Sequence, residues 1–151
     1  MARSDFTYFH RKRVRFAEVD AQAVVFFARY LEYSDIALTE YWRALGMIGN
    51  GPLTGEGSAE FHVAKAVVEY KAPMLLDEEI DIGVRCSRVG RSSMTFDFEF
   101  HGKDRDDLRA IAQSVQVHVA EVRGAPTPVP DRIVALFEAY EGRKLREETK
   151  A

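Results

Sequence analysis

The hydrophobic residues change their spacing partway along the chain, and this change constrains the fold more than any other feature. Before residue 46 they recur at alternating steps of four and three, which is the period of an α-helix. After residue 60 they recur at every second position, which is the period of a half-buried strand. The chain is therefore expected to form a long helix first and a series of strands after it.

The helical pattern covers a wide apolar sector. Its recurring positions are Phe27, Leu31, Ser34, Leu38, Tyr41 and Leu45, with Tyr30, Tyr33 and Ala37 beside them. Only a narrow polar stripe lies opposite, so we expect a helix that is enclosed on most sides. Gly46 then supplies a residue that tolerates the positive φ found where helices end. The glycine-rich segment Gly49 to Gly57, which follows, is predicted to be a mobile loop.

Strand candidates follow at residues 61–70, 80–86, 94–100 and 115–119, and the first of them alternates only weakly. Short links between the last three favour antiparallel hairpins. A further strand candidate, Phe9 to Phe16, precedes the helix, and residues 133–140 have the spacing of a short terminal helix. This order predicts an α+β fold in which a curved antiparallel sheet wraps around one long central helix. We expect one domain over residues 1–151, with a core at about 9–140 and a charged C-terminal tail.

Charge and composition argue against several classes of partner. A net charge of −3 and a pI near 5.8 give no field that would gather nucleic acid. No stretch approaches the roughly 20 apolar residues of a membrane span, and the N-terminus lacks the apolar region of a signal peptide. The single cysteine, Cys86, cannot form an internal disulfide and is expected in the core. Together these features lead us to expect a cytoplasmic protein.

A carboxylate stands just ahead of the long helix, at Asp20. The backbone N–H groups at a helix start are unpaired and carry partial positive charge, so they can bind an oxyanion. Thioester hydrolysis needs both parts, because a carboxylate can attack the carbonyl or take a proton from water while the N–H groups stabilise the tetrahedral intermediate. Alternatively, Asp20 caps the helix with its own side chain. Glu18 is expected to be an exposed turn residue.

The segment from Asp20 to Tyr30 has the form Asp-x-x-x-Val-Val-Phe-Phe-x-x-Tyr. Together with the motifs at residues 68–73 (Val-Glu-Tyr-Lys-Ala-Pro), 77–79 (Asp-Glu-Glu), 89–93 (Val-Gly-Arg-Ser-Ser) and 128–130 (Pro-Val-Pro), it resembles the hotdog-fold thioesterases of the 4-hydroxybenzoyl-CoA thioesterase type. The resemblance covers roughly residues 9–140. It implies hydrolysis of an aromatic or short-to-medium-chain acyl-CoA by a homodimer or homotetramer, without a cofactor or a metal.

The resemblance also implies roles for particular residues. Asp20 would be the nucleophile or general base, and the backbone N–H of Phe27 would polarise the thioester carbonyl. Arg88 and Arg91 would hold the CoA phosphates. Ser92 follows them in the same hairpin and would also bind the substrate. In this family the sheets join edge to edge and the acyl-CoA sites lie at the subunit interface.

Aromatic residues gather near the start of the helix, among them Phe26 and Tyr30. Some of them could line an acyl pocket, although packing of a buried helix explains most of them without any ligand. We therefore predict that Phe26 and Tyr30 bind substrate and keep core packing as the alternative.

Two departures from the family pattern bear on this hypothesis. Many relatives have glycine where Ala23 stands, so the loop after Asp20 could follow another path and aim the carboxylate differently. One branch has histidine at the Phe27 position, and its absence leaves Asp20 to act with backbone and water. A non-catalytic hotdog module that binds an acyl ligand or serves as a scaffold is therefore the alternative function. A dehydratase is disfavoured because none of the four histidines lies on or beside the helix, and the histidine spacings suggest no metal site.

Overall fold

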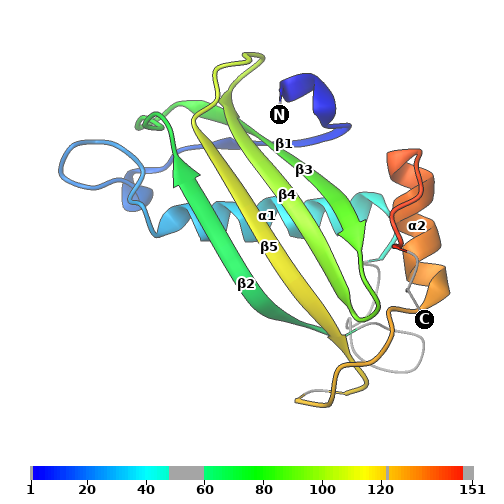
Figure 1. Cartoon of the computed structure of the whole chain (residues 1–151). Coiled ribbons are helices and arrows are strands. Elements are labelled where there is room, and N and C mark those ends of the chain that lie inside the picture. The colour runs from blue at the N-terminus through cyan, green and yellow to red at the C-terminus, as the bar shows by residue number, and fades with distance from the viewer. Residues whose placement is uncertain (1, 48–59, 122, 148–151) are drawn as a thin grey trace.

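The structure is a computed structural model, and it describes residues 2–47, 60–121 and 123–147. A five-stranded antiparallel sheet lies across one long helix, α1, and a shorter helix, α2, stands beside one end of the sheet (Figure 1). The strands are β1 (Tyr8–Arg13), β2 (Glu60–Tyr70), β3 (Glu79–Val89), β4 (Ser93–Gly102) and β5 (Ala110–Val119). The helices are α1 (Arg29–Ala44) and α2 (Asp131–Glu141), and short 3-10 turns occupy Arg3–Asp5 and Phe16–Glu18. The predicted α+β hotdog architecture is confirmed, whereas the predicted loop at 49–57 lies outside the described residues.

The strand order in space is β1-β3-β4-β5-β2, with every neighbouring pair antiparallel. Strands β3, β4 and β5 follow one another as hairpins, as their short links predict. Helix α1 comes between β1 and β2 in the chain, and these two strands occupy opposite edges of the sheet. Each edge strand has one neighbour, which leaves the outer backbone groups of β2 without a strand partner among the described residues.

The core lies between α1 and the sheet. Tyr33, Ala37 and Tyr41 of the helix are fully buried. The sheet contributes every second residue of β3 and β4, namely Ile80, Ile82, Val84, Cys86, Met94, Phe96, Phe98 and Phe100. The period-two pattern therefore identified the inward face correctly, and the expected core position of Cys86 is confirmed. No helix among the described residues is long and apolar enough to cross a membrane.

Strand β2 departs from regular pairing with β5. Lys65 and the residues after it pair in one register, whereas Val63 and the residues before it pair one position away, so Ala64 is an extra residue. Such a bulge reverses the face on which the earlier residues lie. Because of it, Val63 and Ala66 both line the same cavity beneath the sheet. The bulge explains why the sequence of this strand alternates only weakly.

Candidate active site

A tight hairpin carries Asp20 to the start of α1. The backbone N–H of Asp20 donates to the carbonyl of Val24 at 2.9 Å, and that of Phe26 donates to the carbonyl of Glu18 at 3.0 Å. A further bond, from Val25 to the carbonyl of Met74 at 2.9 Å, ties the hairpin to the segment that precedes β3. Backbone bonds on both sides therefore hold the hairpin in one conformation.

Ala23 occupies the left-handed region of backbone space, with φ of 61°. Glycine is favoured there because a side chain at Cβ crowds the following carbonyl oxygen, at a cost of roughly 1–2 kcal/mol. The carbonyl of Ala23 accepts a hydrogen bond from the backbone N–H of Leu76 at 3.0 Å. The alanine thus adopts the backbone conformation that suits glycine, and the turn stores a small strain beside Asp20.

The Asp20 side chain is exposed on the single chain. Its Oδ1 accepts a hydrogen bond from the backbone N–H of Gln22 at 2.8 Å, while Oδ2 has no partner among the described residues. Helix α1 begins later than its apolar pattern indicated, at Arg29, and its N-cap residue is Ala28 with no side-chain cap. The alternative that Asp20 caps the helix is therefore wrong, and one carboxylate oxygen is available for chemistry.

The backbone N–H of Phe27 is unpaired among the residues that the structure describes. Its carbonyl accepts a hydrogen bond from the Tyr70 hydroxyl at 2.8 Å, which anchors this turn to β2. The Phe27 side chain is 63% exposed, so most of this position is open to solvent on the single chain. An open N–H at the start of a helix is a donor suited to a developing oxyanion.

Glu18 lies beneath the hairpin, and the expectation that it would be exposed is wrong. Its side chain is 1% exposed, and its Oε1 accepts hydrogen bonds of 2.8 Å each from Lys12 Nζ, the Arg15 backbone N–H and the Tyr33 hydroxyl. Burial by itself would raise the pKa of Glu18, but these donors outweigh it and lower the pKa to about 2. Glu18 is therefore an ionised anchor that joins β1, the turn and α1.

Two of the predicted substrate-binding residues lie near this turn. Phe26 is partly exposed and its ring lies 4.8 Å from that of Phe27. Tyr30 is buried, with its ring edge-on to Tyr70 at 4.7 Å and near Phe100. Tyr30 thus packs in the core, as the alternative interpretation of the aromatic cluster anticipated for most of its members.

The other three predicted residues lie in the β3–β4 hairpin. Arg88 pairs with Glu147, with Nη2 2.7 Å from the carboxylate, and both side chains are more than half exposed. The guanidinium of Arg91 has no partner among the described residues, while the carbonyl of Ser92 accepts a bond from the His118 backbone at 2.7 Å. This hairpin lies at the far end of β3 from the Asp20 turn, about 30 Å away at 3.3 Å per residue (Figure 1). A single chain therefore does not bring the two groups together.

A cavity of about 240 Å³ lies between α1 and strands β2, β4 and β5. Its apolar lining comes from Leu31, Leu38, Val63, Ala66 and Phe98, and its polar lining from Ser34, Asp35, Ser114 and Gln116. Gln116 and Ser114 carry no motif or spacing that marks them as site residues in the sequence. They lie on the inward face of β5, opposite Met94 and Phe96, whereas the alternating Val115 and Val117 occupy the other face, so the apolar period of β5 pointed away from them.

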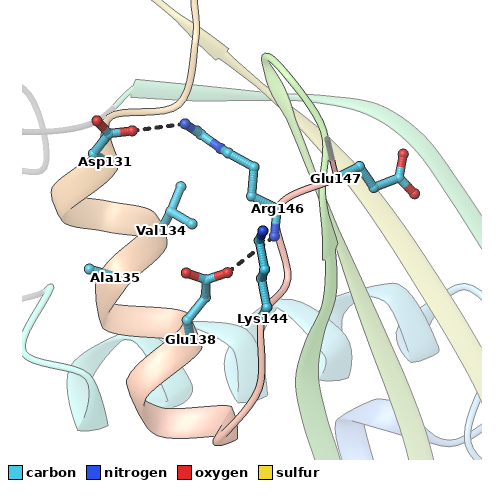
Figure 2. A pocket seen from close by; sticks show the side chains of 7 residues that line it. All are labelled: Asp131, Val134, Ala135, Glu138, Lys144, Arg146 and Glu147. Carbon is cyan, nitrogen blue, oxygen red and sulfur yellow. Dashed lines mark hydrogen bonds and ion pairs between the residues drawn. The ribbon is translucent and has the colours of Figure 1, made fainter. Parts of the chain in front are cut away.

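A second cavity, of about 430 Å³, lies between α2 and the C-terminal segment (Figure 2). Both acidic and basic side chains line it, and Arg146 reaches across to Asp131 at 2.9 Å. Glu138 accepts hydrogen bonds from the backbone N–H groups of Leu145 and Arg146. These contacts tie the tail to α2. Across the described residues, no group of three or more His, Cys, Asp or Glu side chains is arranged to hold a metal ion.

The chain is similar to a family of known proteins. Residues 14–137 match the model of the Thioesterase-like superfamily. The acyl-CoA thioester hydrolase YbgC of Escherichia coli is 30% identical over 126 residues, which are 83% of this chain and 92% of that protein. The 1,4-dihydroxy-2-naphthoyl-CoA hydrolase of Synechococcus elongatus is 23% identical over 126 residues, or 83% of this chain and 91% of that protein.

Among solved structures, a thioesterase from Thermus thermophilus, in complex with coenzyme A and zinc, is 32% identical with a TM-score of 0.78. The match covers 93% of this chain and 98% of that one. The family match extends over most of the chain and includes the Asp20 hairpin, α1 and all of the sheet except β1. The chain therefore belongs to the Thioesterase-like superfamily.

Proposed function

We propose that this protein hydrolyses an acyl-CoA thioester at the turn that joins Asp20 to α1. The observation that carries the proposal is the pairing, on one hydrogen-bonded hairpin, of a free carboxylate oxygen with the unpaired N–H of Phe27. The names of relatives that act on acyl-CoA thioesters support the same reaction class.

Two routes are open to this pair. In the first, an Asp20 oxygen attacks the thioester carbonyl, the coenzyme A thiolate leaves and takes up a proton, and water then hydrolyses the mixed anhydride. In the second, Asp20 takes a proton from a water molecule that attacks the carbonyl directly. In both, the negative charge that develops on the carbonyl oxygen is stabilised by the N–H of Phe27.

A second copy of the chain completes the proposed site. The free edge of β2 offers its backbone groups to another strand, and an exposed edge of this kind is a template for pairing. If two copies of β2 pair in antiparallel fashion, the Glu60 end of one lies beside the Tyr70 end of the other. The β3–β4 hairpin lies at the Glu60 end of its own sheet, since Ser93 pairs with Val117 and Val117 pairs with His62. This pairing therefore brings Arg88, Arg91 and Ser92 of one copy toward Phe27 of the other, and we propose that they bind the coenzyme A phosphates there.

The test is hydrolysis of a panel of aliphatic and aromatic acyl-CoA thioesters by wild type and Asp20→Asn. We expect the variant to lose about 10²-fold or more in kcat/KM, since the amide neither attacks nor accepts a proton. Glu32→Gln, which also removes an exposed carboxylate near the start of α1, serves as the matched control and is expected to keep its activity. Undiminished hydrolysis by a folded Asp20→Asn would remove the role of Asp20.

A wild-type protein that binds acyl-CoA saturably but hydrolyses no thioester in the panel would instead favour the non-catalytic module. Sedimentation or light scattering of the wild type tests the second copy, which we propose as part of a homodimer or homotetramer. A cytoplasmic location remains our proposal from the sequence.

A further inference from the structure

The cavity beside α1 is lined by a buried amide that makes only one weak hydrogen bond among the described residues. Gln116 is 7% exposed, and its side-chain amide makes only a weak 3.5 Å contact with the Ser114 hydroxyl. The apolar side chains of Leu38, Val63 and Phe98 lie around the same space, and the polar part of the lining comes from Ser34, Asp35 and Ser114. An amide in such a wall is unfavourable unless it finds a hydrogen-bond partner. The side chain is therefore placed to bind a polar group inside the cavity.

The cavity starts close to the proposed reacting centre. Leu31, at its near end, is one helical turn beyond Phe27, and Leu38 lies about 10 Å further along the axis at 1.5 Å per residue. The cavity thus extends away from the turn that would hold the thioester carbonyl. An acyl group bound at Phe27 has this space as its continuation.

Gln116 lies toward the far end of that space. Strand β2 runs antiparallel to α1, because Tyr70 contacts the Phe27 end of the helix whereas Phe61 stacks near Trp42 at the other end. Gln116 pairs with Val63, which is seven residues before Tyr70. The amide therefore meets the part of an acyl group that is most remote from the thioester.

The size and charge of the cavity limit what enters it. An engineered cavity of about 150 Å³ is known to hold benzene, so 240 Å³ accommodates one ring with a substituent or a short chain. Asp35, which is exposed on the single chain, also lines the cavity, and its carboxylate has no partner among the described residues. It accepts a hydrogen bond from a hydroxyl group but repels an anionic acyl group.

Resting on the proposed thioesterase function, we propose that Gln116 determines acyl specificity by hydrogen bonding to a hydroxyl group at the remote end of a short or single-ring, uncharged acyl group. An amide both donates and accepts, so it serves either direction of that bond. A site built around such a group discriminates against the analogue that lacks it, because the buried amide is then left unpaired.

The experiment compares kcat/KM for two matched pairs of substrates. One pair is 4-hydroxyphenylacetyl-CoA and phenylacetyl-CoA, and the other is 6-hydroxyhexanoyl-CoA and hexanoyl-CoA. We expect wild type to favour the hydroxylated member of at least one pair by about tenfold or more, which corresponds to one well-made hydrogen bond. In Gln116→Met, which has a similar length and no amide, that ratio should fall to about one.

Gln113→Met is the matched control. Gln113 lies on the same strand but on the other face of the sheet, where it bonds to Asp97 at 3.0 Å, so its replacement should leave the ratio unchanged. Ala66→Leu adds bulk to the cavity wall and should lower kcat/KM more for phenylacetyl-CoA than for acetyl-CoA.

The outcomes separate the two proposals. Hydrolysis with equal kcat/KM for both members of each pair in wild type overturns the role of Gln116 and leaves the thioesterase function standing. The same conclusion follows if Gln116→Met keeps the wild-type ratio, or if Ala66→Leu affects all acyl groups alike. Failure to hydrolyse any of these thioesters overturns the proposed function and, with it, the proposed role of Gln116.

Discussion

Replacing Glu18 with glutamine should destabilise the protein strongly although the two side chains have nearly the same shape. The carboxylate is buried and receives three short hydrogen bonds, and its pKa is about 2 against an ordinary value of 4.5. A shift of one unit corresponds to 1.36 kcal/mol, so the folded environment favours the ionised form by about 3 kcal/mol. The amide cannot supply that charge, and it leaves the largely buried ammonium of Lys12 without its counter-charge.

The stabilisation that Glu18 provides should decrease as the pH falls. The pKa of Glu18 is lower in the folded state than in the unfolded state, so the stabilisation is complete above about pH 4.5 and is lost as the pH falls through about 2. The difference in free energy of unfolding between wild type and Glu18→Gln should therefore decrease from about 3 kcal/mol at pH 7 to about 1.5 kcal/mol at pH 3. Asp81, whose pKa is also lowered to about 2, is present in both proteins and cancels in the difference.

Urea unfolding followed by the fluorescence of the single tryptophan, Trp42, measures this quantity. The protomer concentration must be the same in every sample, because self-association makes stability depend on concentration. Lys12→Met combined with Glu18→Gln removes both charges and should recover part of the loss. A Glu18→Gln protein within about 0.5 kcal/mol of wild type at pH 7, or a difference that does not change with pH, would refute the reasoning.

Three further predictions concern other parts of the structure. Ala23→Gly should raise the free energy of unfolding by about 1 kcal/mol, because it relieves the left-handed strain; thermal unfolding measures the gain, and a loss would contradict the strain argument. Arg109→Gln should lower the free energy of unfolding by about 3 kcal/mol in urea titrations, since Arg109 is buried and pairs with Glu78 at 2.7 Å; a loss below about 1 kcal/mol would count against a buried network. Arg88→Ala should raise KM several-fold for acyl-CoA but not for the matching acyl-pantetheine, while Glu147→Ala, which removes its exposed partner, should not; equal effects on both substrates would exclude a phosphate contact.

Helix α1 and strands β3 and β4 could be predicted from the sequence because their patterns report burial directly, whereas the alternating Val115 and Val117 of β5 lie on the outer face. Cys86 and Phe98, for example, lie on the inward face that alternation assigns to them. The start of α1 was placed two residues early, since Phe27 continues the apolar period although its side chain is exposed on the single chain. An apolar residue that faces solvent in one chain looks the same in sequence as one that faces the core.

Features that depend on long-range contacts could not be predicted in this way. The burial of Glu18 depends on Lys12 and Tyr33, which come from a different strand and from the helix. A pattern of spacing reports which face a residue occupies but not which polar partners gather there. The place of Asp20 ahead of the helix was predictable, whereas its bond to the Gln22 backbone depends on the conformation of the hairpin.

The extra residue in β2 makes the lining of the inner chamber tolerant of a change in chain length. Val63 and Ala66 are three positions apart, yet both face the chamber because Ala64 between them is unpaired. Their partners, Gln116 and Ser114, are two positions apart. Deleting Ala64 would therefore restore regular pairing and leave Val63 opposite Gln116 in the aliphatic wall. Loss of a single codon at this point would thus keep the chemistry that a bound acyl group meets, while the helix and the hairpin of Asp20 keep their sequence.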